Sequence, residues 1–119
     1  MPIIADIVVI LVALLHGYFL VLEMFLWDKP IGLKTFGQSK ERARATKVLA
    51  ANQGLYNGFI AVGLFWGVLQ GNSGADVKIF FLFCVIIAGV FGALSANRKI
   101  LFIQALPGLL GLILILLSS

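Results

Sequence analysis

Hydrophobic residues occur in four long runs along the chain, and short polar stretches separate the runs. The first run extends over Ile3–Trp27, and the second has no charged residue within Val48–Ala75. The third run occupies Ile79–Ala96 and the fourth Ile100–Ser118. Each run is long enough for a helical crossing of a bilayer, which takes roughly 17–25 predominantly apolar residues. The pattern therefore predicts an all-α fold, an integral membrane four-helix bundle.

Turn residues and charges close the runs and set the predicted helix boundaries. Clusters of Gly, Pro and Asn are typical of turns, and three of them stand between the runs, at residues 28–30, 71–74 and 97–99. We predict a single domain that covers residues 1–119. Its helices are expected at residues 3–27, 40–70, 76–96 and 99–118.

The segment Pro30–Ser39 contains two glycines and a polar end, and these features predict a loop. Ser39 is the expected N-cap of the second helix, because a serine hydroxyl can accept a backbone N–H of the first turn. Glu41 follows in that turn, where the helix dipole favours an acidic side chain. The second helix is therefore predicted to begin near Lys40 and to continue into the membrane.

Charged residues are scarce, and their distribution predicts the orientation. They make up 12% of the chain, against about 25% in soluble domains, so a soluble domain is excluded. Lys and Arg concentrate in loops 28–46 and 97–99, whereas Lys78 lies on the opposite side. Because basic loops remain in the cytoplasm, both loops are predicted to be cytoplasmic and both termini to lie outside. The net charge of +4 is then explained by the topology. The expected partner is the lipid bilayer, and no nucleic-acid partner is expected.

Polar and ionisable side chains occur inside three of the predicted spans, where they are costly and point to function. His16 and Glu23 are seven residues apart and therefore share one face of the first helix. The second helix carries four polar residues within an arc of about 140°, and Gln104 lies at a similar depth in the fourth. The predicted ligand-binding residues, gathered towards the cytoplasmic side, are His16, Glu23, Arg42, Asn52, Gln53, Tyr56, Asn57 and Gln104.

These residues also have structural interpretations. Asn, Gln and Tyr often join membrane helices through hydrogen bonds, and Glu23 could form an ion pair with Arg42 or Lys99. A neutral His16 could bond to an Asn or a Tyr. The shared depth of the polar groups is what favours a site. Neither a metal ion nor a cofactor is expected, because the sequence has no pair at metal-ligand spacing and no nucleotide-binding or catalytic motif.

Small residues form stripes on the second and third helices. Gly54 and Gly58 recur at a four-residue spacing, and the third helix adds Gly89 and Gly92. Such stripes allow a neighbouring helix to approach closely. We expect a close helix contact at Gly54 and Gly58, and stripes that face lipid predict a homo-oligomer, either a dimer or a trimer.

Three segments of the chain resemble a bacterial family of small four-helix membrane proteins, catalogued as a domain of unknown function. They are LLHGYFLVLEMFLWDKPIGLKTFG, ATKVLAANQGLYNGFIAVGL and IQALPGLLGL. The resemblance covers essentially the whole chain. It implies a multi-pass protein of the bacterial inner membrane and supplies no activity or substrate. The family's pattern falls on His16, Tyr18, Glu23, Trp27, Phe36, Gly37, Asn52, Gln53, Gly54, Tyr56, Asn57, Gln104 and Pro107.

The start of the second helix is also similar to a segment of the membrane-associated eicosanoid and glutathione metabolism family. The similar stretch is ERARATKVLAANQGLYNGFIAVGLFW, about a fifth of the chain. Arg42 and Asn52 are the counterparts of an arginine and an asparagine in that family's motif. The spacing of the arginines differs, however, and Leu55 stands where the family has a glutamate. This similarity implies a membrane enzyme of glutathione-transferase type.

The sequence therefore supports three hypotheses about function. The first is a binding or transport-type membrane protein whose cytoplasm-facing pocket holds a small polar molecule or a lipid headgroup. The second is an enzyme that uses the same pocket, in which Arg42 holds an anionic cosubstrate and Tyr56 or His16 assists proton transfer. The third is a structural or partner-binding bundle in which the polar cluster only fixes the helix register.

Overall fold

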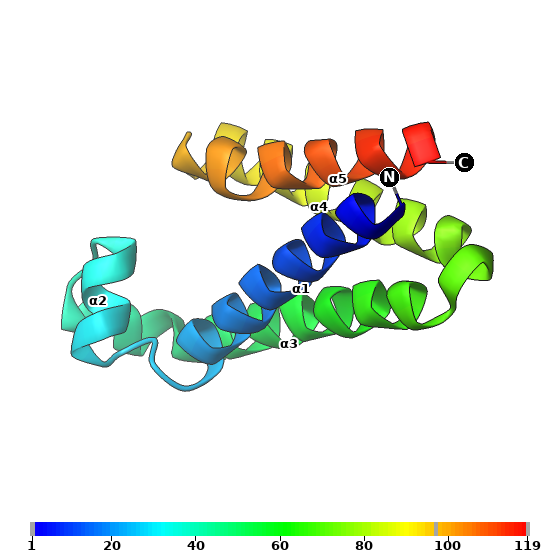
Figure 1. Cartoon of the computed structure of the whole chain (residues 1–119). Coiled ribbons are helices and arrows are strands. Elements are labelled where there is room, and N and C mark those ends of the chain that lie inside the picture. The colour runs from blue at the N-terminus through cyan, green and yellow to red at the C-terminus, as the bar shows by residue number, and fades with distance from the viewer. Residues whose placement is uncertain (1, 97, 119) are drawn as a thin grey trace. The chain divides into compact units, whose positions relative to one another are not determined.

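The structure, a computed structural model, describes residues 2–96 and 98–118. Within this part of the chain, four helical spans are long and apolar enough to cross a membrane. They are formed by α1 (Pro2–Met24), α3 (Lys40–Leu69), α4 (Ala75–Ser95), and a π-helical segment η2 (Leu101–Ala105) that continues directly into α5 (Leu106–Ser118), as Figure 1 shows. The predicted all-α fold with four membrane spans is therefore confirmed.

The chain forms two compact units. Unit 1 comprises Met1–Leu14 and Ile60–Ser119, and unit 2 comprises Leu15–Phe59. Helices α1 and α3 each contribute one end to unit 1 and the other end to unit 2. Of the predicted domain and loops, Met1, Asn97 and Ser119 lie outside the described residues.

The predicted loop at Pro30–Ser39 is wrong over most of its length, because Pro30–Phe36 forms a short helix, α2. Proline is the first residue of this helix, where its missing N–H costs nothing. Gly37 ends the helix in the left-handed conformation, with φ 60° and ψ 44°. Gly32 is required by packing, since a Cβ there would collide with the backbone carbonyl of Leu26.

The helix boundaries on either side of α2 differ in how well the sequence predicts them. Helix α1 ends at Met24 rather than at Trp27, so Trp27 and Asp28 belong to the turn that follows. The predicted N-cap of α3 is confirmed, because the Arg42 backbone N–H donates to Ser39 Oγ at 3.2 Å. Capping of this kind satisfies a backbone donor that the helix itself leaves without a partner.

Unit 1 contains the main apolar core. Side chains from the start of α1, the end of α3, α4 and α5 form it, and the buried members are Ala5, Val9, Val12, Ala13, Leu64, Leu82, Val85, Leu112 and Ile115. An ion pair lies beside this core, since Lys78 Nζ is 2.9 Å from Asp6 Oδ1 and the lysine is buried. A buried cation is tolerated when such a partner is present.

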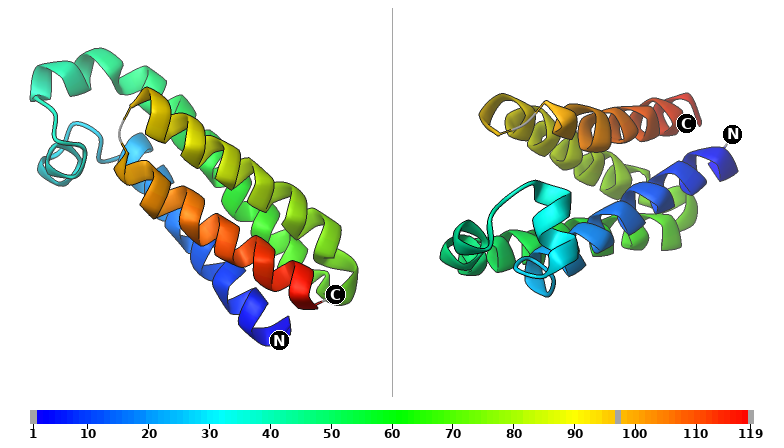
Figure 2. Two further views of the ribbon diagram at one scale, coloured as in Figure 1. Left: turned by 90° about the horizontal axis from the view of Figure 1, so that it is seen from above. Right: turned by 90° about the vertical axis from the view of Figure 1, so that its left-hand side faces the viewer.

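Helices α4 and α5 run side by side within unit 1, as both views in Figure 2 show. A close approach occurs where η2 leads into α5, since a Cβ on Gly89 would lie 2.7 Å from the backbone nitrogen of Ala105 and 2.9 Å from its Cα. Further along the pair, a Cβ on Gly108 would lie 2.8 Å from Val85 Cγ1. The small residues predicted on the third span are therefore used for a helix contact within the chain.

Candidate functional site

The polar cluster of unit 2 is built around Glu23. This side chain lies in the last turn of α1 and is only 4% exposed. One carboxylate oxygen accepts a hydrogen bond from Gln53 Nε2 at 2.9 Å, and the other accepts one from Asn57 Nδ2 at 2.5 Å. Both donors come from α3, four residues apart and therefore on one helix face. The structure thus brings together three of the predicted site residues and satisfies both oxygens of the carboxylate.

Two glycines of α3 allow this arrangement. A Cβ on Gly54 would lie 2.7 Å from Met24 Cγ and 3.2 Å from the backbone carbonyl oxygen of Leu20. A Cβ on Gly58 would lie 2.6 Å from Leu20 Cδ1. The close helix contact predicted at these glycines is therefore present, with α1 as the neighbour. The predicted homo-oligomer stays a prediction.

The other two polar residues of α3 point away from Glu23. Asn52 Nδ2 donates to Tyr56 Oη at 3.3 Å, and both side chains are exposed. Each of them precedes one of the Glu23 ligands by one residue, which rotates it by about 100° around the helix axis. The polar arc expected to form a single surface therefore divides into an inner pair, Gln53 and Asn57, and an outer pair, Asn52 and Tyr56.

His16 lies two helical turns before Glu23 on α1 and is fully buried. Its ring meets Phe19 edge-on, with the ring centroids 5.6 Å apart. Seven helical residues separate His16 from Glu23 by about 10 Å along the axis. The described hydrogen bonds to the Glu23 carboxylate come from Gln53 and Asn57 of α3. His16 and Glu23 are therefore two separate polar positions on the same helix face.

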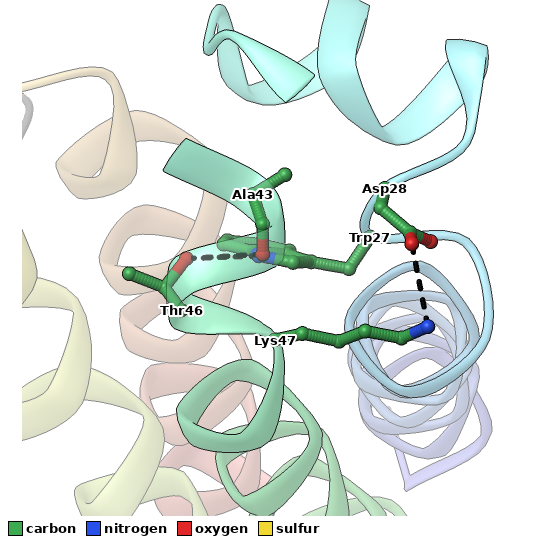
Figure 3. Close-up of polar contacts among 5 residues, drawn as sticks. All are labelled: Trp27, Asp28, Ala43, Thr46 and Lys47. Atoms are coloured by element: carbon green, nitrogen blue, oxygen red, sulfur yellow. Dashed lines mark hydrogen bonds and ion pairs between the residues drawn. The ribbon is translucent and has the colours of Figure 1, made fainter. Parts of the chain in front are cut away.

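A second set of polar contacts joins the end of α1 to the start of α3 (Figure 3). Trp27 Nε1 donates to Thr46 Oγ1 at 3.1 Å, and the ring centroids of Trp27 and Phe36, which is on α2, are 4.8 Å apart. Lys47 Nζ lies 3.3 Å from Asp28 Oδ2. The hydrogen bond from Lys47 holds the pKa of Asp28 below its ordinary value. These contacts hold the turn that follows α1 against the start of α3, close in the chain to Glu23.

Trp27 and Thr46 were not predicted as partners from the sequence. Trp27 stands out as a membrane-interface residue, but Thr46 carries no signal of its own. Its hydroxyl also donates to the backbone carbonyl of Arg42 at 2.8 Å, a bond that threonine commonly makes within a helix. Only the fold shows that this hydroxyl also serves as the acceptor for Trp27.

Arg42 and Gln104 are the remaining predicted site residues. Arg42 is exposed in the first turn of α3, and eleven helical residues place it about 16 Å along the axis from Gln53. Gln104 is half-buried in η2 and belongs to unit 1. Its predicted place in the same site stays a prediction. Among the described residues, no group of three or more His, Cys, Asp or Glu side chains has the arrangement of a metal site.

Comparison with known proteins identifies relatives over nearly the full length of the chain. The family model described as protein of unknown function (DUF1304) matches residues 10–116. The chain is also 31% identical over 115 residues to the uncharacterized protein YpaA of Lactococcus lactis subsp. lactis (strain IL1403). The aligned region covers 95% of this chain and 97% of YpaA. No solved structure is a significant match. The resemblance seen in the sequence is therefore confirmed, and the chain belongs to the DUF1304 family of proteins of unknown function.

Proposed function

We propose that this protein is a membrane-embedded binding protein in which Glu23, held by Gln53 and Asn57, receives the positively charged group of a small polar molecule or a lipid headgroup. The observation that carries this proposal is the composition of the carboxylate's surroundings. Glu23 is buried within a membrane-spanning helix, and its two partners in unit 2 are neutral amides. The amides orient the carboxylate and leave its negative charge for a ligand to balance.

The chemistry of the carboxylate supports this assignment. An ionised carboxylate offers about four lone-pair positions, and two amide donors occupy about half of them. The remaining positions suit an ammonium group, which forms strong charge-assisted hydrogen bonds. Among the described residues of unit 2, the ion pair is the one between Lys47 and Asp28, and the described hydrogen bonds to Glu23 come from Gln53 and Asn57. An ionisable group at membrane depth whose described partners are neutral favours a functional role over a structural one.

The test is a thermal-unfolding measurement on the purified chain in detergent, with ethanolamine and choline as cationic probes and acetate as an anionic control. We expect the cations to raise the unfolding temperature and acetate to leave it unchanged. At a ligand concentration of 100 times Kd, binding stabilises the folded state by about 2.7 kcal/mol. Glu23→Gln, which keeps the shape and removes the charge, should abolish the response.

The matched control is Glu41→Gln, because Glu41 is an exposed glutamate in the first turn of α3. This variant should respond to the cations as the parent protein does. A response retained in Glu23→Gln would contradict the proposed site. If the parent protein responds to none of the probes, the polar cluster serves only to hold the helices together, and the proposal is wrong.

We also propose that the protein resides in the bacterial inner membrane with loops 28–46 and 97–99 in the cytoplasm. The concentration of Lys and Arg in these loops supports this orientation. The test places single cysteines at the exposed positions Thr35 and Asn72, after Cys84→Ala removes the native thiol. In intact cells, an impermeant thiol reagent should label the cysteine at position 72 and leave the one at position 35 unlabelled. The opposite pattern would reverse the orientation.

A further inference from the structure

A groove of about 440 Å³ lies in unit 1 between the end of α4 and the start of η2. Its size falls within the range of sites that hold small molecules. Five of its six lining residues are hydrophobic or small, and the sixth is a cation. The lining residues are Val90, Ala93, Leu94, Arg98, Leu101 and Phe102.

The apolar walls of the groove belong to two membrane spans. Val90, Ala93 and Leu94 are on α4, within the span Gly71–Ser95, and Leu101 and Phe102 begin the span Leu101–Ser118. Leu94 is 85% exposed and Phe102 is 63% exposed. Large apolar side chains with this exposure are stable where hydrocarbon covers them. The walls of the groove therefore suit an acyl chain.

Arg98 stands at the end of the groove where both spans end. It is an exposed turn residue that follows the span Gly71–Ser95, so in a bilayer crossed by these two spans its guanidinium would lie where the hydrocarbon core meets water. A guanidinium donates two parallel hydrogen bonds to a phosphate, a geometry that lysine does not reproduce. The exposed Lys99 follows directly and adds a second positive charge at this end.

The backbone around the groove is held in place by the contact between α4 and η2. Gly89 approaches the backbone of Ala105 closely, as described above. Segment η2 is π-helical, with the Leu106 N–H bonded to the carbonyl of Leu101 five residues earlier. Single π-turns of this kind often occur at functional sites. The two walls of the groove are thus joined by a tight contact at Gly89, which directly precedes Val90 and lies about one helical turn before Ala93.

We propose that this groove binds an anionic phospholipid, with an acyl chain along Leu94 and Phe102 and the phosphate on Arg98. The charge complementarity between Arg98 and a lipid phosphate, together with the apolar walls behind it, selects this occupant. The site is separate from the Glu23 cluster in its residues and in the sign of the charge it receives.

The experiment is native mass spectrometry of the delipidated full chain, titrated with phosphatidylglycerol or with phosphatidylcholine of identical acyl chains. We expect phosphatidylglycerol to bind the parent protein about fivefold more tightly, the effect of one basic residue near an anionic headgroup. Arg98→Gln should abolish this preference, so that the two lipids bind with about equal affinity. Ala93→Phe, which fills the groove and keeps the charge, should weaken the binding of both lipids.

The matched control is Arg44→Gln, since Arg44 is an exposed arginine on α3 outside the groove. It should retain the preference for phosphatidylglycerol. Equal loss of preference in Arg44→Gln and Arg98→Gln would show that overall charge attracts the lipid, and it would overturn the proposal. A preference for phosphatidylglycerol that survives Arg98→Gln would overturn the proposal as well. Because Arg98 is exposed, the Arg98→Gln variant should fold normally, and its result can be interpreted even if Ala93→Phe fails to fold.

Discussion

Replacing Asn57 by leucine is expected to lower the free energy of unfolding by about 1–3 kcal/mol. The variant removes the amide that donates to Glu23 Oε1 and leaves a buried carboxylate oxygen without its partner. A buried polar atom that loses its hydrogen bond carries the full cost of having left water. The measurement is reversible unfolding of the purified protein in detergent, followed by circular dichroism.

Asn52→Leu provides the matched control for this prediction, because it makes the same chemical change on the same helix. Asn52 is exposed and its bond to Tyr56 is on the outer side of α3, so its loss should change stability by at most about 0.5 kcal/mol. Equal effects of Asn52→Leu and Asn57→Leu would show that the amide at position 57 has no special role.

A combined variant separates the cost of an unpaired carboxylate from the value of the cluster itself. Removing all three groups through Glu23→Met, Gln53→Leu and Asn57→Leu leaves no polar side chain of this cluster behind. Replacing an entire buried polar network by apolar residues of similar size is often neutral or stabilising. The triple variant should therefore be more stable than Asn57→Leu alone, although it should lose the response to cationic probes.

Replacing Gly89 by alanine is expected to destabilise unit 1 by about 1–3 kcal/mol. The new Cβ would lie 2.7 Å from the backbone nitrogen of Ala105 and 2.8 Å from its Cβ. Backbone atoms cannot rotate away as a flexible side chain can, so η2 must shift from α4 as a whole. The result is measured as a lower unfolding temperature in the same detergent.

Gly17→Ala is the control for this second prediction. Apart from the backbone of its own helix and its two chain neighbours, no atom of the described residues lies within 4 Å of the position that a Cβ on Gly17 would take. Because glycine is a poor helix former, this substitution should leave stability unchanged or raise it by about 0.5–1 kcal/mol. If Gly89→Ala is as well tolerated as Gly17→Ala, the close contact between α4 and η2 is not a determinant of stability.

The four spans could be predicted from the sequence because the bilayer imposes a simple physical requirement. Inside hydrocarbon, every backbone N–H and C=O must be paired within the segment, and a helix of sufficient apolar length satisfies this requirement locally. The N-cap at Ser39 is also local, because it depends on a hydroxyl and a backbone N–H three residues apart. Both features follow from residues that are neighbours in the chain.

The sequence also indicated that Glu23 would need a partner, since an isolated carboxylate in a membrane is costly. Four polar candidates lie on one arc of α3, and the helical period alone could not show which of them meet the Glu23 carboxylate. The short helix α2 was missed for a related reason, because its seven residues are too few to show a periodic pattern. Proline at its first position and glycine after its last position were the available signals.

Only the tertiary structure decided which amides meet the carboxylate. The rotation of α3 against α1 is fixed by packing, since Gly54 and Gly58 admit Leu20 and Met24 at distances that a Cβ would prevent. This rotation turns Gln53 and Asn57 towards Glu23 and leaves Asn52 and Tyr56 on the outside. Contacts between residues some 30 positions apart depend on side-chain packing between helices, and that packing is not encoded in the spacing along either helix.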